Sequence, residues 1–277
     1  MTTDSVVEKA ATAPQALLPA PGSGPLGGFR NIFAKELADW FGTRRWWIQT
    51  LVWLVIFNAG LAMILFVAPV LDPQASGTPD ELYMSGLGVF FNTLALLGSI
   101  GVIILTQDEI IQEKQSGTAA WILTKPVSRA SFILSKLLSN VIGVLIFVIA
   151  VPALVAYIEI LIASGRGAPV QAYLQALGVI LLTLTFYISL SLMLGTFFEQ
   201  RGPILAGTFG VLVGGLVVSQ FLPKLTYILP LSMDKIALSI LQGQPLSLPM
   251  MYELITAGFL SVLFTVAALW RFGDEEF

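Results

Sequence analysis

The stretch LLSNVIGVLIFVIAVPALVAYI, residues 137–158, decides the fold class, because it carries no charged side chain over its whole length. A helix of roughly 20 apolar residues crosses about 30 Å of hydrocarbon. Five further stretches without a charge lie on either side of it. Together they predict an all-α polytopic membrane protein with six transmembrane helices, at 46–70, 84–106, 137–158, 173–198, 203–222 and 254–270.

The overall composition agrees with a membrane protein. Hydrophobic residues make up 56% of the 277-residue chain and charged residues 11%, whereas soluble proteins carry roughly 25% charged residues. The chain has neither cysteine nor histidine. These absences exclude disulfides, haem ligation by histidine and zinc sites of the usual nitrogen and sulfur type.

The chain before the first span divides into two parts. Residues 1–28, rich in Ala, Pro, Gly and Ser, are predicted to be a disordered cytoplasmic N-terminus without the pattern of a signal peptide. Residues 29–277 are predicted to form one transmembrane domain that opens with an amphipathic interfacial elbow helix at 29–45. The elbow either anchors the topology or also holds a cytosolic partner. Its apolar face comprises Phe29, Ile32, Phe33, Leu37, Trp40 and Phe41, and its polar face Arg30, Asn31, Lys35, Glu36 and Asp39.

Basic residues flank the spans unevenly, with ten on one side of the predicted membrane and three on the other. By the positive-inside rule, both termini and the loop at 107–136 are cytoplasmic. An even number of spans also requires both termini on the same side. The ten are Arg30, Lys35, Arg44, Arg45, Lys114, Lys125, Arg129, Lys136, Arg201 and Arg271, and the three are Arg166, Lys224 and Lys235, with the remote Lys9 left aside.

The cytoplasmic loop QDEIIQEKQSGTAAWILTKPVSRASFILSK, residues 107–136, carries most of the internal charge. The helix of the second span is expected to continue into this loop and to end at Gly117. Thr118 is expected to cap a short helix at 119–124, which ends before Pro126. Ser128 then caps the helix that leads into the third span. A short helix bearing Trp121, Ile122 and Leu123 just outside the membrane is typical of a docking surface.

The order of these elements, with the elbow, the six spans and the long loop between spans five and six, resembles the permease subunits of type 2 ABC transporters over about residues 29–277. In that family the loop contains a coupling helix that fits a cleft on a separate ATPase subunit, and the permease works as a dimer. The resemblance implies an exporter subunit driven by ATP. The ATPase-coupling residues that it implies are Glu109, Glu113, Gly117, Thr118, Trp121, Pro126, Arg129 and Lys136.

The resemblance also implies partners and a location. They are a cytosolic ABC ATPase in two copies, a second permease copy or homologue, and membrane lipids, with no nucleic acid. The chain itself binds no cofactor, because ATP and magnesium belong to the ATPase. The expected location is the inner (cytoplasmic) membrane of the cell.

Each charged residue of the loop also has a plainer interpretation. Glu109 and Glu113 lie one helical turn apart and are solvated in that interpretation, while Arg129 and Lys136 serve topology only. For the loop as a whole, docking is the preferred interpretation. Replacing Trp121 or Arg129 is then expected to uncouple ATP hydrolysis from transport while the fold stays intact.

The chain has no G-x-x-x-x-G-K-[ST] phosphate loop, so it is not expected to be an enzyme, and ATP hydrolysis is expected on a partner. Ion-coupled carriers generally place charges inside the bundle, whereas the nearest charge here is Glu159, at the outer end of the third span. An ion-coupled secondary transporter or channel, and a non-transporting membrane anchor for a partner protein, are the alternatives.

Polar residues inside the spans are candidates for lining a pathway. Thr183, Tyr187 and Ser191 recur every four residues in the fourth span. Their hydroxyls either line a pathway or form hydrogen bonds within and between helices, and packing is the preferred interpretation. Asn58 and Asn92 are expected to be buried and to join neighbouring helices.

Small residues recur every four positions in the fifth span, at Ala206, Gly210 and Gly214. Such a face permits close approach of two helices, either in a dimer contact or inside one chain.

The outer loop before the last span is too apolar to be a free linker. Ser232 and Gly243 are expected to bound a short helix, and the resemblance implies an outer helical hairpin that dips back into the membrane. Met233, Met250 and Met251 are soft ligands that suit Cu(I), but no histidine or cysteine supports them. Packing is therefore preferred and no metal site is expected.

Overall fold

The structure is a computed structural model that describes residues 24, 26–72, 77–118, 121, 127–222, 224 and 227–274. Within these ranges every regular element is a helix, and six helices are long and apolar enough to cross a membrane. The predicted all-α polytopic membrane fold is confirmed. The six spans are Arg45–Leu71, Pro79–Gln115, Arg129–Ser164, Val170–Phe197, Arg201–Ser219 and Leu248–Gly273.

Several spans are built from successive helical segments, in which short π-helical stretches interrupt the α-helix. The α-helices are α1 (Phe29–Phe41), α2 (Arg45–Leu54), α3 (Gly60–Ala62), α4 (Ala68–Leu71), α5 (Pro79–Thr106), α6 (Ile111–Gln115), α8 (Arg129–Gly143), α9 (Val151–Ser164), α10 (Val170–Phe197), α11 (Arg201–Phe209), α12 (Gly215–Ser219), α13 (Met233–Leu241) and α14 (Leu248–Gly273). The π-helical stretches are η1 (Val55–Ala59), η2 (Met63–Val67), η4 (Val144–Ala150) and η5 (Gly210–Gly214).

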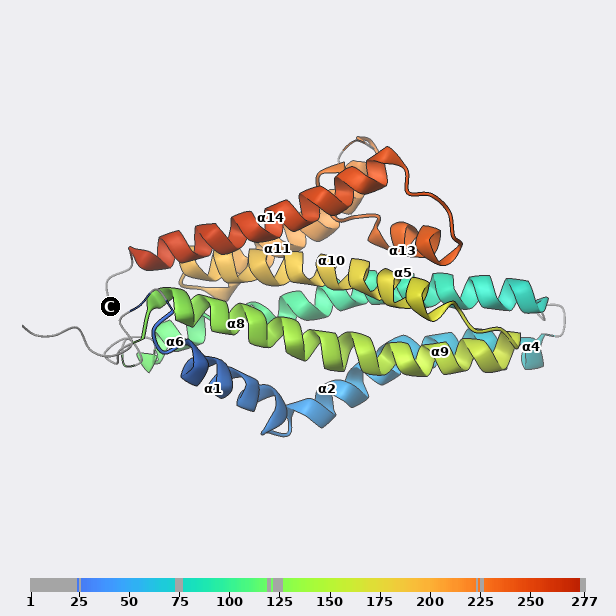
Figure 1. Cartoon of the computed structure of the whole chain (residues 1–277), viewed down its shortest axis with the longest axis horizontal. Helices are drawn as coiled ribbons and strands as arrows, with labels where there is room; N and C mark the ends of the chain where they lie inside the picture. The colour runs from blue at the N-terminus through green and yellow to red at the C-terminus, as the bar shows by residue number, and fades with distance from the viewer. Residues whose placement is uncertain are drawn as a thin grey trace, which may run out of the picture.

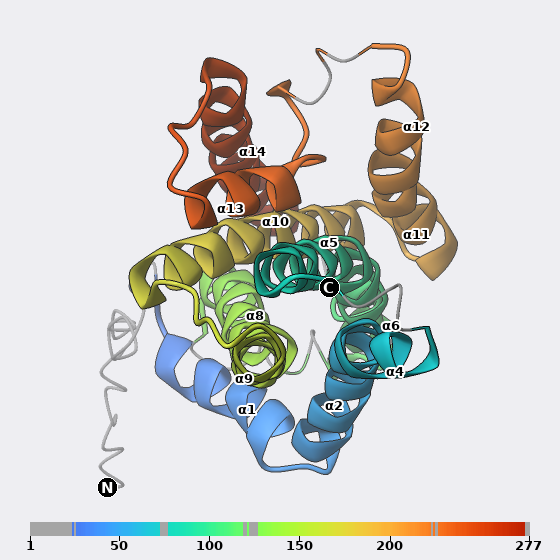
Figure 2. The ribbon, with the colours of Figure 1, turned by 90° about the vertical axis from the view of Figure 1, so that its right-hand side faces the viewer.

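Helices α5 and α10 lie at the centre of the bundle, with α8, α9 and the first span on one side and α11, α12 and α14 on the other (Figure 2). The starts of α1 and α8, the helix α6 and the end of α14 lie at one end of the long axis, which we call the proximal end (Figure 1). The opposite end, with α4 and the connection from α9 to α10, is the distal end. In the most hydrophobic part of each span, 61% of α10 but only 22% of α14 is buried, so the periphery exposes apolar surface suited to a lipid environment.

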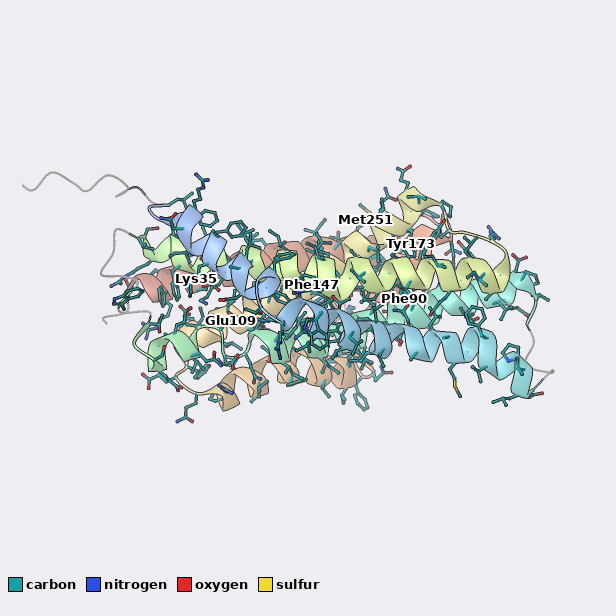
Figure 3. All side chains as sticks on the ribbon, turned by 90° about the horizontal axis from the view of Figure 1, so that it is seen from below. Lys35, Phe90, Glu109, Phe147, Tyr173 and Met251 are labelled. Carbon is teal, nitrogen blue, oxygen red and sulfur yellow. The ribbon has the colours of Figure 1, made fainter. Side chains whose placement is uncertain are left out.

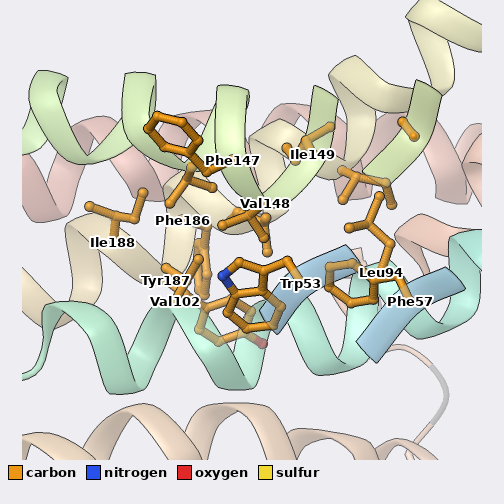
Figure 4. Packing of buried hydrophobic residues seen from close by; sticks show 14 of the residues in the cluster. Trp53, Phe57, Leu94, Val102, Phe147, Val148, Ile149, Phe186, Tyr187 and Ile188 are labelled. Atoms are coloured by element: carbon orange, nitrogen blue, oxygen red, sulfur yellow. The ribbon is translucent and has the colours of Figure 1, made fainter. Parts of the chain in front are cut away.

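The core is packed tightly enough to require glycine at particular positions. Trp53 lies against α5 beside Val102 and Tyr187 (Figure 4). A Cβ atom at Gly101 would lie 1.8 Å from the Trp53 ring. A side chain larger than hydrogen at this position therefore forces the two spans apart.

A helix is confirmed in the predicted elbow, as α1, and it packs along α8. It ends at Phe41, because residues 42–44 form bends and a turn before α2 begins at Arg45. Trp40 is 1% exposed, and its ring occupies the space where a Cβ at Gly143 would lie, 2.3 Å away. Glu36, which the periodicity placed on the polar face, is instead buried with Ile32 and Trp40. That part of the prediction is wrong, because the four-residue spacing of 32, 36 and 40 puts all three on the face that meets α8.

The loop between the second and third spans follows the predicted boundaries in part. The helix of the second span does not run unbroken, because a turn at 107–110 separates α5 from α6. Gly117 has a φ of 70°, the left-handed conformation that ends a helix, and the Ser128 hydroxyl accepts the Ser131 N–H at 3.0 Å as the predicted cap. Most of the predicted coupling helix at 119–124, and Pro126, lie outside the described residues, as does most of 1–28.

Candidate functional site

A buried lysine organises the proximal end of the bundle. The Lys136 side chain is 2% exposed, and its Nζ atom lies 3.2 Å from Glu36 Oε2, 3.1 Å from Glu113 Oε1 and 3.5 Å from Glu109 Oε2. The three carboxylates come from α1, from α6 and from the turn before α6. A charge this deeply buried is stable only with charged or hydrogen-bonded partners.

Two further cations complete this group. Lys35 Nζ lies 3.0 Å from Glu113 Oε1, and Arg45 Nη2 lies 3.6 Å from Glu109 Oε1. We call Lys35, Glu36, Arg45, Glu109, Glu113 and Lys136 the proximal ionic cluster. It holds three cations and three carboxylates, and Figure 3 shows Lys35 and Glu109 at this end of the bundle.

The surroundings of Lys35 favour its charged form. Partial burial lowers the pKa of the Lys35 ammonium, but the Glu36 and Glu113 carboxylates raise it by more, so the pKa lies above its ordinary value. A polar cavity of about 400 Å³ opens beside the cluster, lined also by Asp39, Asp108 and Gln112. Among the described residues, no group of acidic side chains has the geometry of a metal site.

The structure therefore brings together three of the predicted coupling residues, Glu109, Glu113 and Lys136. The interpretation of Glu109 and Glu113 as solvated surface charges is wrong, since their side chains are only 14% and 13% exposed. Sequence reasoning missed the contribution of Glu36. The available signal was its spacing of four residues from both Ile32 and Trp40.

Residues 115–118 and Trp121 of the loop lie toward the surface. Trp121 is helical and 60% exposed, and its N–H donates to the Gly117 carbonyl at 3.0 Å. The hydroxyls of Ser116 and Thr118 lie 2.8 Å apart. This part of the loop is the accessible portion of the proximal end.

Arg129 forms hydrogen bonds within the chain. Its guanidinium donates to the carbonyl oxygens of Phe272, at 3.5 Å, and Gly273, at the C-terminal end of α14. The ring of Phe132, one turn later, stacks on Phe272 with centroids 5.0 Å apart. Arg129 thus ties the third span to the sixth, and its replacement is expected to weaken this contact in addition to any effect on coupling.

Two of the predicted pathway residues, each at the middle of its helix, meet beneath α13 in the distal half of the bundle (Figure 1). Asn92 and Thr183 line a cavity of about 110 Å³ together with Ser99 and Asp234. Asn92 Nδ2 donates to Asp234 Oδ2 at 3.3 Å, across from α5 to α13. Asn92 is exposed, so the prediction that it is buried is wrong. We call these four residues, from α5, α10 and α13, the distal polar pocket.

The other pathway candidates do not line this pocket. Asn58, Tyr187 and Ser191 are buried. Within the part of the chain that the structure describes, the Asn58 amide and the two hydroxyls have no hydrogen-bond partner. Thr183 donates back to the Val179 carbonyl at 3.2 Å, which agrees with the packing interpretation for that hydroxyl.

The small-residue face of the fifth span points away from the bundle. Ala206 and Gly210 are exposed and Gly214 is half-buried. A Cβ at Gly210 or Gly214 would meet no atom of the described residues within 4 Å. The face is therefore not a helix contact inside the described part of the chain.

The predicted short helix of the outer loop is confirmed as α13, between Ser232 and Gly243. The Ser232 side chain makes no capping bond; instead, its backbone N–H donates to Glu253 Oε1 at 2.6 Å. Met233 is buried in the apolar contact with α10 and α14, as the packing interpretation requires.

Comparison with known proteins places this architecture among membrane proteins. A family model described as "Protein of unknown function (DUF2705)" matches residues 47–274. The chain is also similar to the "Uncharacterized transmembrane protein YxlG" of Bacillus subtilis (strain 168), with 25% identity over 244 residues, 83% of this chain and 93% of the relative. The family match includes Glu109, Glu113 and Lys136, and it begins after Glu36.

Proposed function

The chain belongs to the DUF2705 family, and from that premise we propose that it is the membrane-spanning permease subunit of an ATP-driven ABC exporter. It works as a dimer, and a separate cytosolic ATPase drives it through the loop at 107–136. In this proposal the chain lies in the inner membrane with its proximal end toward the cytoplasm, because among the described residues nine basic side chains flank the spans on that side and three on the other.

The observation that carries the proposal is the proximal ionic cluster. It joins the elbow α1, the charged loop and the third span through one buried lysine. Removing Lys136 leaves three largely buried carboxylates without their shared cation, at a cost of about 3–5 kcal/mol. A force applied to the loop is therefore passed to α1 and α8 together, which is the mechanical property that a coupling loop requires.

The loop also has an accessible contact for a partner. Trp121 is 60% exposed and stands one turn beyond Gly117. Tryptophan is enriched among the residues that dominate protein interfaces. In the proposal Trp121 enters the ATPase, while Glu109, Glu113 and Lys136 hold the loop to the spans rather than touching the partner.

The transport path and the dimer contact are assigned to other regions. The distal polar pocket, with Asn92 and Thr183, lies beneath α13 in the distal half of the bundle (Figure 1) and is suited to the outer part of a pathway. The exposed small-residue face at Ala206, Gly210 and Gly214 allows a second copy to approach closely.

Co-purification tests the proposal. The tagged full chain is isolated from cells that co-express a candidate phosphate-loop ATPase, chosen from the reading frames that neighbour its own, and the recovered ATPase is quantified. We expect Trp121→Ala to lower recovery about tenfold, because loss of an interface tryptophan commonly costs more than 1 kcal/mol. Trp270→Ala is the matched control, since Trp270 is 66% exposed on α14 near the same end.

Other outcomes point to the alternatives. Equal recovery with Trp121→Ala and the parent chain removes the docking assignment. Solute flux by the purified chain alone along an ion gradient identifies a secondary transporter or channel. Stable ATPase recovery without nucleotide-dependent flux identifies a membrane anchor.

A further inference from the structure

An apolar groove of about 280 Å³ runs between the third and fourth spans toward the distal end. Its rim residues Leu154, Val170 and Leu174 are 63%, 64% and 61% exposed, so the groove opens sideways from the bundle. A lateral opening within membrane-spanning helices faces the hydrocarbon of the bilayer. The groove is lined by Ala150, Ala153, Leu154 and Tyr157 on one side and by Val170, Tyr173, Leu174 and Leu177 on the other.

Two tyrosines make the floor of the groove apolar. The Tyr157 hydroxyl donates to the Ala168 carbonyl at 3.0 Å, and the Tyr173 hydroxyl donates to the Ala153 carbonyl at 2.8 Å. Their rings pack edge to face with centroids 5.2 Å apart. Because both hydroxyls are used within the chain, the floor offers little to hold an ordered water, which needs two to four polar partners.

The loop that leads into the groove carries a cation. Arg166 lies in the loop that joins α9 to α10, and its side chain is 61% exposed. Its Nη1 atom donates to Asp80 Oδ1 at 3.1 Å, and its guanidinium carbon lies 4.8 Å above the Tyr83 ring. The Asp80 side chain is 83% exposed, so this ion pair is weak. A guanidinium has five N–H donors and binds phosphate well.

We propose that this groove binds one acyl chain of a glycerophospholipid from the distal leaflet, with the lipid phosphate at Arg166. Val170, which lines the groove, follows Arg166 by four residues. An apolar groove with an exposed cation in the loop that leads into it matches an amphiphile with an anionic head. At about 280 Å³ the groove is at the lower end of small-ligand pockets, roughly 300–1,000 Å³, which suits a single chain. The inference does not depend on ATP-driven transport.

The energetics of this site differ from those of binding from water. A lipid chain is already in an apolar medium, so entering the groove brings no hydrophobic gain. Affinity comes instead from close van der Waals contact with the groove walls and from the phosphate contact. The site therefore prefers a lipid with a phosphate over a neutral lipid with the same chains.

Native mass spectrometry of the full chain in dodecyl maltoside tests the proposal. The probes are 1-palmitoyl-2-oleoyl-phosphatidylglycerol and the diacylglycerol with the same chains. We expect retention of one phosphatidylglycerol per chain. Ala150→Phe, which fills the groove, lowers that retention about tenfold, equal to about 1.4 kcal/mol. The control Ala59→Phe changes an exposed alanine of the first span and leaves retention unchanged.

The headgroup arm uses Arg166→Gln. We expect about fivefold weaker phosphatidylglycerol retention, since one cation beside an anionic lipid contributes about 1 kcal/mol, and unchanged diacylglycerol retention. Lys224→Gln, another exposed distal cation, is the control. If Ala150→Phe and a second blocking variant, Leu154→Trp, both retain as much lipid as the parent chain, the groove site is overturned. If Ala59→Phe lowers lipid retention as much as Ala150→Phe does, the groove site is also overturned, because the lipid is then bound non-specifically.

Discussion

The proximal and distal ends of the bundle are held by different chemistry. At the proximal end, Lys136 is enclosed by three carboxylates, and each contact is charged and buried. At the distal end the contacts are separate hydrogen bonds, such as Asn92 to Asp234 and Ser232 to Glu253, and one exposed ion pair. Buried charges stabilise the fold only while all their partners are present. A single hydrogen bond contributes about 1 kcal/mol to stability, so one can be lost without the others. The proximal end is therefore suited to move as a unit and the distal end to open locally.

The strongest way to break this comparison is Lys136→Met. It leaves three carboxylates without their shared cation, so we expect the free energy of unfolding to fall by about 3–5 kcal/mol. Unfolding of the detergent-solubilised chain, followed by circular dichroism, measures the loss. Lys35→Met is the matched control, because Lys35 is 47% exposed and its loss costs less than about 1 kcal/mol. Equal stability of the two variants contradicts the cluster's structural role.

Gly101→Ala tests the middle of the bundle, where packing alone holds the spans. The added Cβ would lie 1.8 Å from the Trp53 ring, so we expect a loss of about 3 kcal/mol, the upper part of the usual range for overpacking. The same unfolding measurement applies. Gly88→Ala is the control, since its Cβ meets no described atom within 4 Å, and a helical alanine there is expected to stabilise slightly.

Glu253→Ala sharpens the comparison at the distal end. It removes the acceptor of the Ser232 N–H at the start of α13, which costs about 1–3 kcal/mol. We expect this loss to be local. Hydrogen exchange at the α13 amides is therefore expected to accelerate while exchange in α8 is unchanged. Acceleration in both helices shows that the two ends are not independent.

Asp80→Asn is expected to have the smallest effect. The Arg166–Asp80 pair is exposed on both sides, so the stability change is expected to be below about 1 kcal/mol. A larger loss in the unfolding measurement would show that the distal end depends on charge as the proximal end does.

The sequence was sufficient for the spans but not for the contacts between them. A charge-free run of about 20 residues has few alternatives to crossing a membrane, which is why all six spans were found. The partner of Glu36 was not predictable in the same way. Lys136 is 100 residues away in sequence, and only the packing of α1 on α8 brings the two side chains together.

Asn92 illustrates the same limit at the distal end. An asparagine in an apolar run is expected to be buried, but Asn92 is exposed. Its exposure depends on how much of this face of α5 is covered by α13. Helical periodicity indicates which residues share a face, yet it does not specify which later segment covers that face. Asp234, its actual partner, lies 142 residues further along the chain.

The distance between labels on the two copies of the proposed dimer tests the proposed function most directly. The chain has no cysteine, so Asn31→Cys in the first turn of α1 and Gln171→Cys at the start of α10, both exposed, each give one spin label per copy, at the proximal and distal ends. In the reconstituted complex with its ATPase, we expect ATP binding to change the two inter-copy distances in opposite directions, as alternating access requires. If both distances stay constant while the complex hydrolyses ATP, the chain is not the permease proposed here.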